Sequence, residues 1–212
     1  MTRTMKTTTR MRTTRTTRMT ESFASLSVEG YGAALASASS APGGGSAAAL
    51  CASLAAALLS MSRALGCADK NTAALEALRL ELLRLVDEDS AAFVPVTEAW
   101  KLPKDDPNRS AVLEKAHATA AETPLKLMTL CGELTALCEQ VCRECSQSLL
   151  PDVASAAALC IGALCAAAAN VRANTYYMKK PAALNAEADR MLREYGGKAR
   201  GVFAEIYGKL EK

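Results

Sequence analysis

Three groups of residues in this sequence have types and spacings that suit ligand binding or catalysis. The first is Gly43-Gly44-Gly45-Ser46, which follows Pro42 and stands directly before a long run of alanines. Glycine takes backbone angles closed to other residues and, without a Cβ atom, lets other groups approach closely. The N–H groups of a first helical turn have no partner within the helix, and the helix dipole is positive there. The stretch predicts a polar or anionic ligand site at a helix start, with Ser46 or Gly45 near the N-cap; a tight turn between packed helices is the alternative.

The second group is the acidic run Asp87-Glu88-Asp89. On a helix, Asp89 lies one turn from both Leu85 and Phe93, so it leans toward the apolar stripe, whereas Glu88 points elsewhere. Most acidic runs simply form a solvated helix face. A carboxylate flanked by core positions is costly to bury unless it is used, and this raises Asp89 as a functional residue.

The third group is the pair Asn170 and Asn174, which follows an alanine-rich segment. Residues four apart share one face of a helix, and two amides there can offer donors and acceptors to a planar heterocycle. Considered alone, the pair is better explained as two amides that satisfy backbone groups beside a kink.

The eight cysteines include Cys138, Cys142 and Cys145, whose spacing matches the iron–sulfur motif of radical enzymes that use S-adenosylmethionine. That motif normally lies on a loop after a strand. Here the same spacing continues the stripe from Cys131 along one helix face, so we predict core packing in place of a cluster. Disulfides are not expected, because the chain shows no export signal.

His117 is the single histidine, which excludes a metal site built from several histidines. Its neighbours in EKAHATAAE are alanines and charged residues, and we therefore expect a solvated or half-buried position. No nucleophile elbow accompanies it, so a Ser-His-Asp mechanism is not indicated.

The elements that position these groups are helices almost throughout, and no segment shows convincing strand alternation. Pro95 is expected to kink or end the third helix, Pro124 to bend the fourth, and residues 101–108 to form a loop. We predict an all-α fold, a single up-and-down bundle of about six helices. The expected helices cover residues 23–40, 46–67, 72–95, 110–150, 151–179 and 181–209.

The composition of the chain limits the kinds of partner that it can bind. Half of the residues are apolar but only 4% are aromatic, and a core so rich in alanine brings helix backbones close together, as subunit interfaces often do. Residues 1–18 hold six of the 25 basic residues and no acid, so the rest has 19 basic and 22 acidic residues, a net charge of −3. That balance does not indicate nucleic-acid binding. The apolar stretches 47–62 and 153–171 are expected to be buried bundle helices and not membrane spans.

The composition of the N-terminal segment indicates where the folded domain begins. Residues 1–21 are almost wholly Thr, Arg and Met, a composition that predicts a disordered basic tail. An organelle presequence is the minority interpretation, and an upstream mis-start or a dispensable extension is favoured. Residues 22–212 are expected to form the folded domain, located in the cytoplasm.

Six segments occur in one order along residues 22–210: SAPGGGSAAALCASLAAALLSM, LVDEDSAAF, LPK, AAETPL, LPDVASAA and AAAANVRAN. Together they resemble the formiminotransferase-cyclodeaminase C-terminal domain family, which includes stand-alone cyclodeaminases and methenyltetrahydrofolate cyclohydrolases. No single segment is decisive, but the set is specific. We expect no formiminotransferase half within these 212 residues.

The resemblance implies an all-helical homodimer that binds a tetrahydrofolate derivative, with or without a polyglutamate tail, between its helices. In cyclodeaminases, N10 of 5-formiminotetrahydrofolate attacks the formimino carbon and ammonia leaves, which gives 5,10-methenyltetrahydrofolate. In cyclohydrolases, water adds to that methenyl carbon and the ring opens to 10-formyltetrahydrofolate. Both reactions pass through amidinium-like cations and need proton transfers that a buried carboxylate can supply. No metal and no redox cofactor is expected.

The resemblance also implies roles for the residues. Asp89 is the expected acid/base, with Asp87 as the alternative if the register differs by half a turn. Residues 43–46 would form the cleft floor and offer amides to the folate. The stretch lacks the ending of a nucleotide-binding loop, which argues against a phosphate ligand. A non-catalytic helical bundle, either folate-binding or an assembly partner, remains the alternative function.

Asn170 and Asn174 would hold the pterin edge or the reacting nitrogens. Lys104, near the mouth, would meet the glutamate tail, although exposed lysines are usually only solvated. The sequence departs from the family at Arg172-Ala173, where family members often carry apolar residues, and this leaves the orientation of the segment open.

Overall fold

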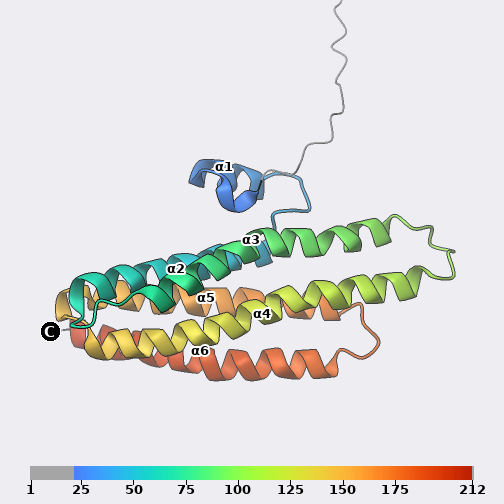
Figure 1. Ribbon diagram of the computed structural model, residues 1–212. Coiled ribbons are helices and arrows are strands. Elements are labelled where there is room, and N and C mark those ends of the chain that lie inside the picture. Colours follow the sequence, from blue (N-terminus) through green and yellow to red (C-terminus); the bar gives the residue numbers. More distant parts are fainter. Residues whose placement is uncertain (1–21, 212) are drawn as a thin grey trace, which may run out of the picture.

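The computed structural model describes residues 22–211, and the predicted tail of residues 1–21 lies outside them. The described residues are helical with turns and contain no strand, which confirms the all-α prediction. The long helices run up and down beside one another, and the short helix α1 lies apart from them on one side (Figure 1). The elements in order are η1 (Phe23–Ser25), α1 (Val28–Leu35), α2 (Gly44–Gly66), α3 (Ala73–Trp100), α4 (Arg109–Glu144), η2 (Gln147–Leu149), α5 (Leu150–Thr175) and α6 (Ala182–Leu210).

The segment expected as one helix over residues 23–40 is instead a single 3-10 turn followed by the eight-residue α1. Ser27 interrupts it, because its side chain accepts a hydrogen bond from Gly30 N–H and so caps a new helix start. Gly30 and Gly32 weaken any longer helix, and turns and bends follow α1 to residue 42.

Pro95 and Pro124 both lie inside helices that continue past them. Pro95 neither ends α3 nor stops it short, since the helix continues to Trp100. Val96 and Ala99 are buried against α4 beyond the proline, and this small apolar cluster holds the last turn together. Pro124 lies within α4, which likewise continues past it.

The long fourth helix expected to residue 150 ends earlier, at Glu144, and the turn at η2 then leads directly into α5. That turn is bonded to the end of α2, because Ser146 N–H donates to Gly66 O at 3.0 Å. Likewise α5 ends at Thr175 and not near residue 179.

The core explains the alanine-rich composition. Helix α5 packs against α2, α4 and α6, and it and α2 fill their contacts largely with buried alanines, while α3 contributes leucines such as Leu82 and Leu85. Small side chains let the backbones approach closely, and this closeness brings the first turn of α2 within reach of α3 and α5.

Helix α2 and the segment Gln147–Thr175 are each long and apolar enough to cross a bilayer by length and composition alone. Core helices of water-soluble bundles meet the same criterion, and in this fold both helices pack into the centre of the bundle.

Candidate active site

The glycine-rich stretch lies where the bundle is open. Gly43 is the N-cap of α2, with extended backbone angles (φ −127°, ψ −162°), so the helix begins two to three residues before the predicted position at Ser46 or Gly45. Ser46 lies inside the first turn, where its buried hydroxyl pairs with the hydroxyl of Tyr31 at 2.9 Å. That bond fixes α1 against the start of α2.

Close approach is what requires glycine here. A Cβ atom on Gly45 would lie 2.1 Å from Oδ1 of Asp89, and one on Gly44 would lie 3.2 Å from Nδ2 of Asn170. No glycine of the described residues has a positive φ, so left-handed backbone conformation is not the reason. The start of α2 is therefore in direct contact with both polar groups that the sequence had singled out, the acid on α3 and the amide on α5.

The Asp89 carboxylate lies against the first turn of α2, close to the backbone N–H of Ser46. Burial raises the pKa of Asp89 above its ordinary value, and the Ser46 N–H only partly offsets this. No lysine or arginine of residues 22–211 forms an ion pair with it. Asp89 is thus a partly buried carboxylate whose counter-charge is missing from the described protein.

Asp87 has a different environment. Its two carboxylate oxygens accept hydrogen bonds from the Ser22 hydroxyl at 2.5 Å and from the Phe23 N–H at 2.7 Å. A third, longer bond comes from Ala24 N–H at 3.4 Å. Asp87 therefore anchors the first turn of the described chain to α3, and its oxygens are already used.

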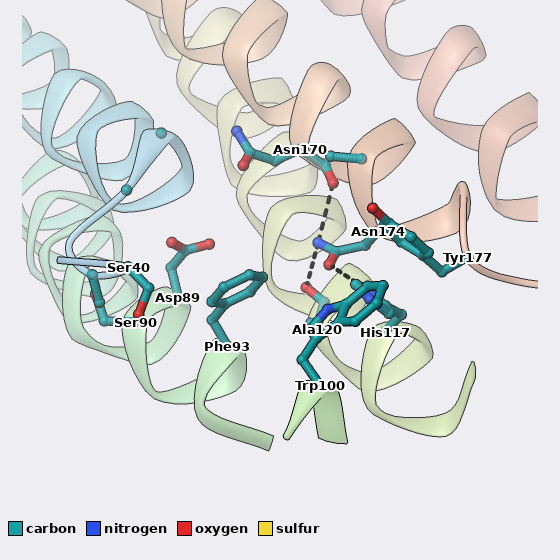
Figure 2. Close-up of a pocket in the computed structure, with 14 residues that line it drawn as sticks. Ser40, Asp89, Ser90, Phe93, Trp100, His117, Ala120, Asn170, Asn174 and Tyr177 are labelled. Carbon is teal, nitrogen blue, oxygen red and sulfur yellow. Dashed lines mark hydrogen bonds between the residues drawn. The ribbon is translucent and has the colours of Figure 1, made fainter. Parts of the chain in front are cut away.

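Beside Asp89 is a cavity of about 360 Å³ between the start of α2 and helices α3, α4 and α5 (Figure 2). Its size suits a small heterocyclic ligand. Both polar and aromatic side chains line it. The lining residues are Ser40, Ala41, Gly43, Gly44, Asp89, Ser90, Phe93, Trp100, His117, Ala120, Asn170, Ala173, Asn174 and Tyr177.

The two asparagines line this cavity but have different hydrogen bonds. Asn170 donates its Nδ2, the side-chain atom nearest Gly44, to the carbonyl of Ala166 at 2.8 Å, and its Oδ1 accepts no hydrogen bond from residues 22–211. Asn174 donates its Nδ2 to the carbonyls of Asn170 (3.1 Å) and Ala120 (3.4 Å), and its Oδ1 lies 3.2 Å from Nδ1 of His117. The structural alternative, amides satisfying backbone groups, thus describes Asn174 well, and Asn170 keeps a free acceptor.

His117 is buried, so the prediction of a solvated or half-buried position is wrong. It is only 3% exposed, and its ring stacks on Tyr177 with centroids 4.4 Å apart. Trp100 meets the same imidazole edge-on at 6.3 Å. The alanines around His117 in the sequence, which suggested exposure, are the small residues that let the helices close over it.

Lys104 does not line the cavity that holds Asp89. It lines an adjoining depression of about 320 Å³, together with Arg109 and with Trp100 and Tyr177, the two aromatic residues that the depression shares with the cavity. The guanidinium of Arg109 lies over the Trp100 ring at 5.0 Å. This second hollow thus brings two cations next to the aromatic wall, and Arg109 was missed at the sequence level.

The cysteine prediction is confirmed for Cys131, Cys138 and Cys142, which are buried on the core face of α4, while Cys145 follows the end of that helix. Burial raises the pKa of Cys138 and Cys142, as expected of thiols in an apolar core. In residues 22–211, no three His, Cys, Asp or Glu side chains lie close enough to hold a metal ion.

Phe93, Trp100 and Tyr177 were also missed by the sequence reasoning. The only available signal was their rarity, since the chain has one tryptophan, three phenylalanines and five tyrosines. Aromatic residues so scarce in a core this rich in alanine are good candidates for a ligand wall.

Asp89→Asn should stabilise the protein near neutral pH. The pKa of Asp89 is higher folded than unfolded, so the ionised carboxylate opposes folding above the folded pKa and has no such effect below the unfolded one. We expect a higher thermal midpoint at pH 7, by about 2–4 °C per kcal/mol recovered, and an advantage that shrinks as the pH falls through that window. Circular dichroism melts across pH would measure it.

Asp87→Asn is the matched control, two residues away on the same helix. It weakens bonds that the carboxylate accepts from Ser22 and Phe23 and should therefore lower the midpoint at pH 7. Equal destabilisation by both substitutions would contradict the difference described between the two aspartates.

Comparison with known proteins gives consistent results. The methenyltetrahydrofolate cyclohydrolase of Methylorubrum extorquens is 32% identical over 155 residues, which are 66% of this chain and 74% of that protein. The formimidoyltransferase-cyclodeaminase of Mus musculus is 33% identical over 152 residues. These residues are 65% of this chain but only 28% of the mouse protein.

The fold has a counterpart among solved structures. The crystal structure of formiminotetrahydrofolate cyclodeaminase from Thermotoga maritima superposes with a TM-score of 0.74 at 23% identity, over 88% of this chain and 96% of that one. The model of the family described as Formiminotransferase-cyclodeaminase matches residues 27–192, most of the described chain. The predicted resemblance is therefore confirmed, and this chain belongs to the formiminotransferase-cyclodeaminase family.

Proposed function

We propose that this chain is a folate one-carbon enzyme, a formiminotetrahydrofolate cyclodeaminase or a methenyltetrahydrofolate cyclohydrolase. The observation that carries the proposal is the Asp89 carboxylate, which faces the cavity without a cationic partner among residues 22–211. Both substrates bring a cationic one-carbon unit, and such a ligand would supply the missing counter-charge. The names of the two relatives, a cyclohydrolase and a cyclodeaminase, support the same class of substrate.

In the cyclodeaminase reaction, the N10 lone pair attacks the formimino carbon and a tetrahedral carbon forms. N10 then loses its proton and the departing nitrogen must gain one before ammonia leaves. Asp89 can accept the first proton and deliver it to the second nitrogen, because both are bound to the same carbon. A pKa raised by burial suits this exchange, since the group must hold the proton as well as release it.

In the cyclohydrolase reaction, water attacks the methenyl carbon and loses a proton, which gives a neutral hydroxyl adduct. The bond from that carbon to N5 then breaks as N5 is protonated and the hydroxyl gives up its proton to become the formyl carbonyl, so one proton is released overall. The same carboxylate in the same position can serve both transfers. Each step is a proton transfer or a rearrangement of bonds at one carbon, and we therefore propose that no metal or redox cofactor takes part.

We assign the pterin ring to the space between Phe93 and the aromatic wall of Trp100 and Tyr177. The free N–H groups of the first α2 turn, at Gly44 and Gly45, would bind its polar edge, together with Oδ1 of Asn170. The glutamate tail would run over Trp100 into the adjoining hollow, toward Lys104 and Arg109. A polyglutamate tail would extend this charged contact.

Asp89→Asn should lower kcat by about 100- to 10,000-fold with either substrate, the range expected for loss of a general acid/base, while affinity for a folate that carries no cationic carbon stays within a few-fold. Asp87→Asn should keep turnover, because Asp87 bonds to the first turn and not to the cavity. Decay of the methenyl absorbance and release of ammonia would measure the two reactions.

The same assays separate the alternatives. Comparison of kcat/KM for 5-formiminotetrahydrofolate and 5,10-methenyltetrahydrofolate decides between cyclodeaminase and cyclohydrolase. Wild-type protein that binds folate but turns over neither substrate would favour a non-catalytic folate-binding bundle. Full activity in Asp89→Asn would sink the assignment of the acid/base.

Gly45→Ala tests the contact between α2 and the carboxylate. Its Cβ atom would lie 2.1 Å from Asp89 Oδ1, so the carboxylate must move, and kcat should fall at least tenfold. Gly43→Ala is the control, since its Cβ atom meets nothing within 4 Å and the backbone angles suit any residue. Equal activity in the two variants would show that the close contact is not needed.

We further propose that the protein is a homodimer joined through the outward faces of α2 and α5, two helices that pack against each other. Helix α2 carries no charged residue before Arg63, and α5 carries none between Asp152 and Arg172. Leu54 (51%), Met61 (39%) and Leu65 (66%) are exposed on α2. An uncharged apolar face of this kind usually marks an interface.

Leu54→Glu should convert the dimer to a monomer, since it buries a charge in the proposed interface. Light scattering after gel filtration would report the mass relative to the 22.3 kDa chain. Leu80→Glu is the control, because Leu80 is similarly exposed (46%) but lies on α3. A wild-type monomer, or a dimer unaffected by Leu54→Glu, would contradict this interface.

We also propose that the enzyme is soluble and cytoplasmic and that it has no membrane or nucleic-acid partner. Relatives named as folate enzymes support the soluble state, and the burial of α2 and α5 in the bundle supports it as well.

A further inference from the structure

The imidazole of His117 has a defined hydrogen-bond state that the reaction scheme above does not use. It lines the cavity from α4 and is 3% exposed. Its Nδ1 lies 3.2 Å from Oδ1 of Asn174. Its Nε2 is buried and has no hydrogen-bond partner among the described residues.

The bonds of Asn174 determine which nitrogen carries the proton. Its Nδ2 donates to the carbonyl oxygens of Asn170 and Ala120, so the amide orientation is fixed and Oδ1 is the atom that faces the histidine. An amide oxygen only accepts, and therefore Nδ1 of His117 must donate. In the neutral ring, Nε2 is then a bare acceptor.

The ring is also held in place by aromatic contacts. Tyr177 stacks on it at 4.4 Å with an interplanar angle of 18°, and Trp100 covers it edge-on. Both covering residues are half exposed, Trp100 at 43% and Tyr177 at 45%. Because Nε2 is itself buried, a ligand reaches it only if one of these half-exposed rings moves.

A buried acceptor without a donor is costly in a folded protein, and natural structures pair nearly all such groups. Residues 22–211 offer His117 Nε2 no donor, and the side chain lines the cavity. A bound ligand with an N–H group is the partner that this arrangement lacks. In the view of Figure 2, Asp89 and His117 lie on opposite sides of the cavity, with Phe93 between them.

We propose that Nε2 of His117 accepts a hydrogen bond from a ring N–H or amino group of the bound pterin and so selects for that ring. This inference rests on the proposed folate function and adds a specificity-determining residue to it. Asn174 is its positioning residue, because the amide holds the imidazole in the accepting tautomer. The two polar ends of the cavity then recognise different features of one ligand, a cation at Asp89 and an N–H donor at His117.

The single histidine makes the tautomer directly measurable. Untagged protein labelled with nitrogen-15 gives one pair of imidazole signals in a long-range proton–nitrogen spectrum. We expect the free protein to show a protonated Nδ1 and a bare Nε2. Addition of 5-formyltetrahydrofolate, a stable mimic of the formimino compound, should shift the Nε2 signal toward that of a hydrogen-bonded nitrogen.

Two substitutions separate ligand recognition from a structural role. His117→Asn keeps an amide at the Nδ1 position and can retain the bond to Asn174, but it removes the acceptor at Nε2. His117→Gln places a carboxamide oxygen near Nε2. The dissociation constant of 5-formyltetrahydrofolate should rise about tenfold or more in His117→Asn, equivalent to loss of one good hydrogen bond, and about threefold or less in His117→Gln.

The outcomes are distinct. Folate binding that leaves the Nε2 nitrogen signal unshifted would overturn the role of His117. So would an equal loss of folate affinity in both variants together with a lower melting temperature. Either result leaves the proposed function intact. An Nε2-protonated ring in the free protein would also overturn it. Wild-type protein that binds no folate would overturn both proposals.

Discussion

The contact between the Asp89 carboxylate and the first turn of α2 is the constraint on which the site depends. Two opposing effects act on this group. The Ser46 N–H and the positive end of the helix favour the ionised form, whereas burial disfavours it, and burial is the stronger. The contact is possible only because Gly45 has no side chain, and it forces α3 to lie close against α2.

Helix α5 connects the two ends of the cavity. Asn170 meets the same helix start through Gly44, its carbonyl accepts from Asn174, and Asn174 in turn holds His117. One face of a single helix thus carries contacts from the start of α2 to the N-terminal quarter of α4. The i, i+4 spacing of the two asparagines gives this continuity, although each amide has a different task.

The sequence predicted the parts of the site that follow from helical periodicity. Spacing separated Asp89 from its neighbours and placed Asn170 and Asn174 on one face. It did not predict the burial of His117, because the covering rings of Trp100 and Tyr177 come from the distant ends of α3 and α5. Likewise, nothing local announced that packing against α4 would carry α3 past Pro95. Such tertiary contacts override local preference, and periodicity carries no information about them.

A folded protein rarely leaves a buried polar atom without a partner, and here an imidazole nitrogen without a donor and a partly buried carboxylate without a cation line the same cavity. The fully buried leucines of α3 and α4 supply the stability that tolerates both. A ligand that satisfies both groups must carry positive charge at one end and N–H donors at the other. A reduced pterin with a formimino or methenyl carbon has both features in one rigid frame. The two unsatisfied groups would then give the cavity its selectivity, because a ligand that satisfies only one of them leaves the other unpaired.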